Sequence, residues 1–128
     1  MDLLLDTHCF IWLNYAENKI PESVMEMLAD EEYSLLLSSI SIWEICQKYT
    51  SGKLELHIPP EDLIAHAKHS FGIEILDFTE VDNYRLQSLP KIHKDPFDRM
   101  LICQAIENQL AIVTDDKMIS SYPIKIIW

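Results

Sequence analysis

The sequence predicts an α/β protein with a mainly parallel central sheet. Short apolar runs, of which Leu3 to Leu5 is the first, alternate along the chain with amphipathic helical patterns. That first run is continuous and does not alternate with polar residues, which is typical of a parallel strand buried on both faces. Repeated alternation of strand and helix favours parallel strands joined by right-handed crossovers.

In the first half of the chain, local signals mark where the expected helices begin and end. Asp6 and Thr7 follow the first strand and can cap the next helix. Pro21 suits the first turn of the second helix, and Gly52 ends the third. Strands are expected at residues 3–5 and 33–37, and helices at residues 10–15, 21–30 and 41–49.

The second half of the chain continues the same alternation. Pro59 and Pro60 open a helix that Gly72 ends, and Thr79 starts another. Strands are expected at residues 73–76, 111–113 and 124–127, and helices at residues 61–70, 79–86 and 96–108, with a helical turn after residue 115. Because no repeat or linker interrupts the pattern, residues 1–128 are expected to form one domain. The local patterns do not define the order of the strands.

The charge balance argues against a broad nucleic-acid-binding face. The chain has 10 Lys plus Arg and 21 Asp plus Glu, which gives a net charge of −11. A protein that holds nucleic acid by a broad surface carries a basic face instead. Any nucleic-acid substrate must therefore be held locally, at cation-neutralised carboxylates and a modest basic rim. The candidates for this rim are Lys48, Lys53, Lys91, His93, Lys94 and Arg99.

The cysteines and the hydropathy pattern predict a soluble, cytoplasmic protein. Cys9, Cys46 and Cys103 are odd in number and far apart, with no C-x-x-C pair. Buried, reduced thiols in a cytosolic protein fit this pattern best. No segment approaches the roughly 20 apolar residues that a membrane span needs, and the N-terminus lacks the features of a signal peptide. We therefore expect no contact with a membrane.

Four carboxylates occur where an expected strand ends or an expected helix begins. They are Asp6, Glu44, Asp98 and Asp116. Because the carboxyl ends of parallel strands lie at one edge of the sheet, these side chains are expected to share an acidic pocket. Carboxylates gathered in this way repel one another unless a hard cation such as Mg²⁺ or Mn²⁺ neutralises them. The pattern therefore indicates a metal-dependent enzyme.

Each of these acids also has an ordinary structural explanation. Asp6 and Asp98 suit helix N-termini, where a carboxylate accepts backbone hydrogen bonds. Glu44 lies off the apolar stripe of its helix with Lys48 four residues further on, so an exposed ion pair would account for it. The structural explanation is the better one for any single acid. It weakens because the same coincidence recurs at several expected strand ends.

Five segments of the chain form a set: residues 4–8, 39–45, 52–54, 95–101 and 113–116. Together these five segments resemble the PIN-domain family, and more closely the VapC-type ribonuclease toxins of bacterial toxin–antitoxin pairs. The most specific of them is the block from Asp95 to Arg99, which reads D-P-F-D-R. The resemblance extends over almost the whole chain, with the segments in the expected order.

The resemblance implies a three-layer α/β/α domain that cuts RNA with the help of Mg²⁺ or Mn²⁺. It assigns the catalytic and metal-binding acids to Asp6, Glu44, Asp98 and Asp116. The spacing T-x-D from Thr114 favours Asp116 over Asp115, and Asp95 is a further acid of the D-P-F-D-R block outside the assigned set. A cognate antitoxin, likewise implied, would neutralise the acidic toxin with a basic segment. A homodimer with two active sites is also implied.

Arg99 and Lys48 are the candidate substrate contacts, because a guanidinium or ammonium group can bind a phosphate. Two alternative functions remain open. A receiver-like signalling domain would hold Mg²⁺ too, but it would need a lysine after a late strand, whereas strand 111–113 is followed by Thr114, Asp115 and Asp116. An inactive PIN-like scaffold is the other, and the presence of all four acids disfavours it.

Overall fold

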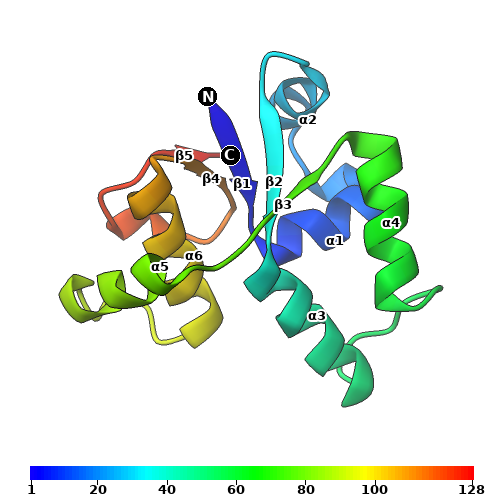
Figure 1. The fold of residues 1–128 in the computed structure, drawn as a ribbon. Helices are drawn as coiled ribbons and strands as arrows, with labels where there is room; N and C mark the ends of the chain where they lie inside the picture. Colours follow the sequence, from blue (N-terminus) through cyan, green and yellow to red (C-terminus); the bar gives the residue numbers. More distant parts are fainter.

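The computed structural model describes residues 1–128 and contains a five-stranded sheet (Figure 1). All neighbouring strands are parallel, in the order β3-β2-β1-β4-β5. The strands are β1 (Asp2–Leu5), β2 (Ser34–Ser38), β3 (Glu74–Leu76), β4 (Ala111–Val113) and β5 (Ile126–Ile127). The expected parallel α/β fold is confirmed, and the strand order places β1 at the centre of the sheet.

Helices cover both faces of this sheet. They are α1 (Thr7–Tyr15), α2 (Glu22–Ala29), α3 (Ser39–Thr50), α4 (Pro60–Phe71), α5 (Glu80–Arg85) and α6 (Pro96–Asn108), with short 3₁₀ helices at Glu17–Lys19, Leu86–Ser88 and Ile119–Ser121. Figure 1 shows α1, α2 and α4 on one side of the sheet and α5 and α6 on the other. None of the helices is both long enough and apolar enough to cross a membrane.

The three leucines of β1 explain how one strand serves two cores. Leu3 and Leu5 are fully buried in the same apolar cluster as Phe10 of α1, whereas Leu4 is fully buried in a second cluster with Ile102 of α6. Successive side chains of a strand point to opposite faces of the sheet. A central strand with helices on both sides must therefore be apolar at all its buried positions, as Leu3, Leu4 and Leu5 are.

Local hydrogen bonding decides where several elements begin and end. Helix α1 begins at Thr7, three residues earlier than expected, because Asp6 is its N-cap and accepts a hydrogen bond from the Cys9 N–H at 2.6 Å. Helix α4 ends at Phe71 and is capped by Gly72, whose φ of +66° favours glycine. At the C-terminus, only Ile126 and Ile127 pair with β4, so the last strand is shorter than expected.

In α3, one expectation is wrong and one alternative explanation does not hold. Cys46 is exposed, although Cys9 and Cys103 are buried as expected. Glu44 is only 5% exposed, so it is not part of a solvated ion pair. The apolar stripe does not define the buried face of α3 because the helix turns polar residues, and not only apolar ones, toward α1 and α6.

Candidate functional site

A pocket outside the carboxyl ends of β1 and β4 is lined only by polar residues. They are Asp6, Thr7, His8, Glu44, Lys48, Asp95, Asp98, Asp115 and Asp116. The structure thus brings together the four acids singled out from the sequence, together with two further aspartates. This position, at the carboxyl edge of a parallel sheet, is where α/β folds bind their ligands.

Asp6 is held rigidly where β1 ends. Its N–H donates to the carbonyl of Val113 at 3.1 Å, which ties it to β4. One carboxylate oxygen caps α1, and the other accepts a hydrogen bond from the hydroxyl of Thr114. Burial raises the pKa of Asp6 to about 6, and these hydrogen bonds only partly offset that effect. The capping role and the place in the pocket therefore belong to the same side chain.

Asp98 enters the pocket from the first turn of α6. Asp95 is the N-cap of this helix and accepts hydrogen bonds from the N–H groups of Phe97 and Asp98 at 2.8 and 3.3 Å. Burial and the neighbouring charge of Asp95 raise the pKa of Asp98 to about 7. Asp6 and Glu44 contribute to this rise and His93 partly offsets it, so the pocket holds carboxylates whose negative charges oppose one another.

The segment after β4 turns Asp116 toward the pocket. The Asp116 N–H donates to the Thr114 hydroxyl oxygen at 3.0 Å, and one carboxylate oxygen accepts the Met118 N–H at 2.8 Å. Partial burial acts to raise the pKa of Asp116, but hydrogen bonds from His93 and Met118 outweigh it and hold the pKa below its usual range. Asp115 also lines the pocket, although it is exposed.

Glu44 and Lys48 bring opposite charges to the pocket from α3. The ammonium of Lys48 lies 2.6 Å from a carboxylate oxygen of Glu44, as the spacing of four residues on a helix allows. The Glu44 side chain is 6% exposed, whereas that of Lys48 is 39% exposed. Lys48 therefore combines a contact to a buried acid with access to solvent, as a phosphate-binding group would need.

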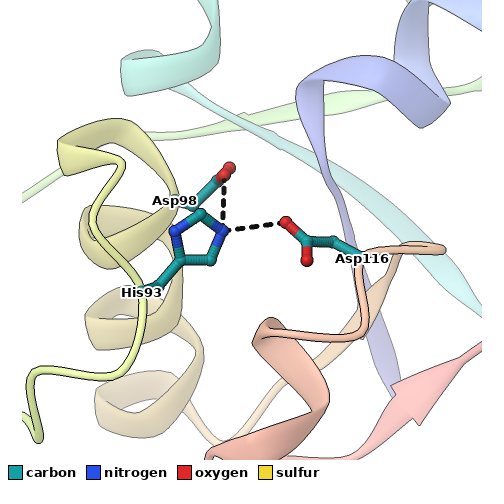
Figure 2. A group of neighbouring side chains, drawn as sticks. All are labelled: His93, Asp98 and Asp116. Atoms are coloured by element: carbon teal, nitrogen blue, oxygen red, sulfur yellow. Dashed lines mark hydrogen bonds and ion pairs between the residues drawn. The ribbon is translucent and has the colours of Figure 1, made fainter.

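His93 is the main residue whose position the sequence did not indicate. It was expected on the basic rim, but its side chain is only 10% exposed and lies between Asp98 and Asp116 (Figure 2). A histidine two residues before the N-cap of a helix can fold back onto the helix start, and that spacing is the signal available in the sequence. Arg99 has a different surrounding, since its guanidinium donates to the carbonyl of Pro90 at 3.0 Å and does not line the pocket.

The pocket has the chemistry of a site for a hard divalent cation. Its acids supply oxygen ligands, which Mg²⁺ and Mn²⁺ prefer, and no cysteine lines it. The raised pKa values of Asp6 and Asp98 show that ionised carboxylates are destabilised there when no cation is bound. A cation would remove this penalty, so the residues fit a metal ion.

Replacing Asp95 with alanine is expected to lower the free energy of unfolding by about 1 kcal/mol, because α6 loses its N-cap acceptor. The pKa of Asp98 should fall as well, since the charge of Asp95 contributes to raising it. The matched variant Asp95→Asn keeps an acceptor and removes the charge, so it should lower the pKa of Asp98 with little loss of stability. Denaturant unfolding and NMR titration measure the two quantities. A pKa of Asp98 that is unchanged in both variants would contradict this account.

The parallel sheet and the acidic pocket at its carboxyl edge form a candidate cation site, with the residue types that enzymes use to cleave phosphodiesters. The family model described as PIN domain matches residues 3–125. The chain therefore belongs to the PIN domain family, a family of nucleases that hydrolyse nucleic acids. No curated protein matches the chain in sequence.

Solved structures with the same fold cover nearly the whole chain. A chain of VapBC2 from Rickettsia felis, bound to a DNA fragment from its promoter, has a TM-score of 0.73 and 20% identity over 99% of this chain and 98% of that one. DNA-bound VapBC from Salmonella typhimurium gives 0.68 and 21%, covering 99% and 97%. A toxin-antitoxin complex from Klebsiella pneumoniae gives 0.66 and 15%, covering 98% and 96%. At these identities the likeness describes the fold.

Proposed function

We propose that this chain is a metal-dependent endoribonuclease and acts as the toxin of a VapC-type toxin–antitoxin pair. The observation that carries the proposal is the pocket in which Asp6, Glu44, Asp98 and Asp116 converge on a PIN domain. Residues 1–128 would act as one nuclease unit. The family membership supports cleavage of nucleic acid, and the choice of RNA rests on the resemblance of five segments to VapC-type ribonucleases.

Asp6 and Asp98 are the proposed primary ligands of Mg²⁺, with Mn²⁺ as a possible substitute. Asp6 is buried and Asp98 is partly buried, and the pKa of each is raised, so both carboxylates gain most from a neighbouring cation. Glu44 and Asp116 complete the acidic set. When bound, a divalent ion supplies Lewis-acid stabilisation of the charge that develops on phosphate oxygens.

The remaining polar residues of the pocket would orient the acids and the substrate. Thr114 fixes Asp6 through its hydroxyl and receives the N–H of Asp116, so one threonine sets the positions of two acids. Lys48, partly exposed beside Glu44, is the better placed of the two proposed phosphate contacts. Arg99 would reach a phosphate only by leaving the carbonyl of Pro90.

Two further partners are proposed on the same basis. The net charge of −11 and the acidic pocket would suit an antitoxin that inserts a basic segment. In each of the complexes from Rickettsia, Salmonella and Klebsiella, one chain has the same fold as this chain. The Klebsiella complex is a toxin-antitoxin complex, which supports a protein partner of this kind. A homodimer is implied by the VapC-type resemblance, and sedimentation equilibrium of the purified chain would measure it.

The purified, metal-stripped protein is expected to cleave single-stranded RNA only after Mg²⁺ or Mn²⁺ is added, and to leave a DNA of the same sequence intact. Gel analysis of end-labelled substrates measures this, with calorimetry of Mg²⁺ binding in parallel. The exposed acid Glu32 lies outside the pocket, so Glu32→Gln is a control that should retain full cleavage. Metal binding without cleavage of any nucleic acid would instead support the inactive scaffold.

A further inference from the structure

His93 makes a contact that none of the proposed catalytic roles uses. Its Nε2 lies 3.1 Å from Oδ2 of Asp98 and 2.8 Å from Oδ2 of Asp116 (Figure 2). The residue belongs to the segment between the 3₁₀ helix Leu86–Ser88 and α6, whereas Asp116 follows β4. One imidazole nitrogen therefore bridges two carboxylates that come from different parts of the sequence.

A backbone hydrogen bond determines which nitrogen of the ring carries the proton. The N–H of Asp95 points at Nδ1 of His93, at 3.1 Å. A backbone N–H can only donate, so Nδ1 must offer its lone pair, and the proton of the neutral ring lies on Nε2. The Nε2–H group then donates to Oδ2 of Asp116, and Oδ2 of Asp98 lies 3.1 Å from the same nitrogen. In this tautomer Nε2 has no lone pair left for a cation.

We propose that His93 is a positioning residue, whose Nε2–H fixes the carboxylates of Asp98 and Asp116 toward each other, and that it is not itself a metal ligand. A cluster of one histidine and two aspartates would otherwise resemble a three-ligand metal site. The hydrogen bond to Nδ1 distinguishes the two possibilities. The inference rests on the proposed function only where it concerns the use of these acids to hold a metal ion.

The segment that carries His93 is anchored independently of the acids. The hydroxyl of Tyr122 accepts the N–H groups of Ile92 and His93 at 3.1 and 2.8 Å, and donates to the carbonyl of Pro90 at 2.8 Å. Tyr122 is only 3% exposed. Arg99 donates to two carbonyls of the same segment. The imidazole is therefore preorganised by contacts that do not depend on a bound cation.

The contact of His93 with Asp98 and Asp116 leaves different carboxylate oxygens available in the two residues. Asp116 uses Oδ2 for His93 and Oδ1 for the N–H of Met118. Asp98 uses Oδ2 for His93, while its Oδ1 has no hydrogen-bond partner in the protein. The unpartnered oxygen of Asp98 is the one most available to a cation. Asp116 is oriented at both oxygens, so it would act mainly through its charge and its remaining lone pairs.

NMR of the imidazole nitrogens tests the tautomer directly. In mildly alkaline buffer, long-range ¹H–¹⁵N correlations of His93 should show a protonated Nε2 and an unprotonated Nδ1, with and without Mg²⁺. In the Mn²⁺-loaded protein, pulsed EPR should detect no imidazole nitrogen bound directly to the metal. A proton on Nδ1 with Nε2 unprotonated, or a nitrogen coupling that His93→Gln removes, would overturn the proposal.

Metal affinity measured by calorimetry tests the positioning role. His93→Ala should weaken Mg²⁺ binding about 10- to 100-fold, as removal of a group that orients a ligand typically does. His93→Gln should restore most of this loss because its side-chain amide supplies a donor near the place of Nε2–H. The exposed His69 provides a control, since His69→Ala should bind Mg²⁺ normally.

An equal loss of Mg²⁺ affinity in folded His93→Ala and His93→Gln would contradict the positioning role. An unchanged Mg²⁺ affinity in His93→Ala would contradict it as well. Circular dichroism establishes that each variant is folded. None of these measurements uses RNA cleavage. If the wild type failed to cut RNA while the tautomer and the affinities behaved as described, the proposed nuclease function alone would fail.

Discussion

Replacing Asp98 with asparagine is expected to reduce metal-dependent RNA cleavage by about a thousandfold, which corresponds to roughly 4 kcal/mol of transition-state stabilisation. The reason is that Asp98 offers the pocket a carboxylate oxygen that accepts no hydrogen bond from the protein, and an amide oxygen carries no charge to hold a divalent ion. The change is nearly isosteric, and it removes a charge that is opposed by Asp95, Asp6 and Glu44. The folded state should therefore be retained in the metal-free protein.

Cleavage rates at saturating Mg²⁺, with thermal unfolding of the same samples, measure both parts of this prediction. Asp6 requires a more careful substitution, because its Oδ1 also caps α1. Asp6→Asn keeps an acceptor for the Cys9 N–H and should lose activity without losing the cap, whereas Asp6→Ala should lose both. Cleavage by a folded Asp98→Asn variant at the wild-type rate would remove Asp98 from the catalytic set.

The metal-free protein is expected to become more stable as the pH falls from about 8 toward 5. Asp6 has a pKa of about 6 in the folded protein and Asp98 of about 7, both above the ordinary value of 3.8. Between pH 5 and 8 the folded state therefore binds more protons than the unfolded state, so the free energy of unfolding decreases as the pH rises. For the buried Asp6 alone, the full effect is roughly 3 kcal/mol, at about 1.4 kcal/mol per pKa unit.

Ionisation of Asp116 stabilises the folded protein, which is the opposite of the effect of Asp6 and Asp98, but it does so at lower pH. Its pKa is below 3.8 in the folded protein, so the stability that it contributes is lost only as the pH falls through that lower range. Saturating Mg²⁺ should abolish the slope above pH about 5, because a bound cation keeps Asp6 and Asp98 ionised and the folded and unfolded states then bind equally few protons there.

Melting temperatures across this pH range, with EDTA or with Mg²⁺, measure the effect. The variant Asp98→Asn provides the matched comparison, since it lacks one of the two titrating groups and should show a shallower slope without metal. A metal-free wild type that grows more stable as the pH rises from 5 to 8 would contradict the raised pKa values of Asp6 and Asp98.

From the sequence, each aspartate could be explained either as a helix N-cap or as a residue of the acidic site. The structure shows that the two roles are compatible. Asp6 caps α1 with one oxygen and presents its carboxylate to the pocket. Asp95 caps α6 and thereby directs the next acid, Asp98, toward the same place. A helix N-terminus at the carboxyl end of a strand orients an acid and stabilises its charge. The same local geometry therefore serves both purposes.

Sequence patterns alone determined the alternation of strands and helices, and the position of the acids where strands end. These features depend on local preferences: the three leucines of β1, the capping aspartates and the glycine that ends α4 act over a few residues. The carboxyl edge of a parallel sheet collects such acids whatever the order of the strands. For this reason the four acids could be grouped without knowledge of the topology.

Only the tertiary structure decided the strand order, the burial of Glu44 and the place of His93. Glu44 is buried because α3 lies against α1 and α6, which a single helical stripe does not report. His93 reaches Asp116 because Tyr122, 29 residues away in the sequence, fixes its backbone. Such contacts arise from packing between distant segments, so no local pattern of hydropathy or charge encodes them. The sequence identified which acids meet, and the packing of distant segments determined which groups hold them in place.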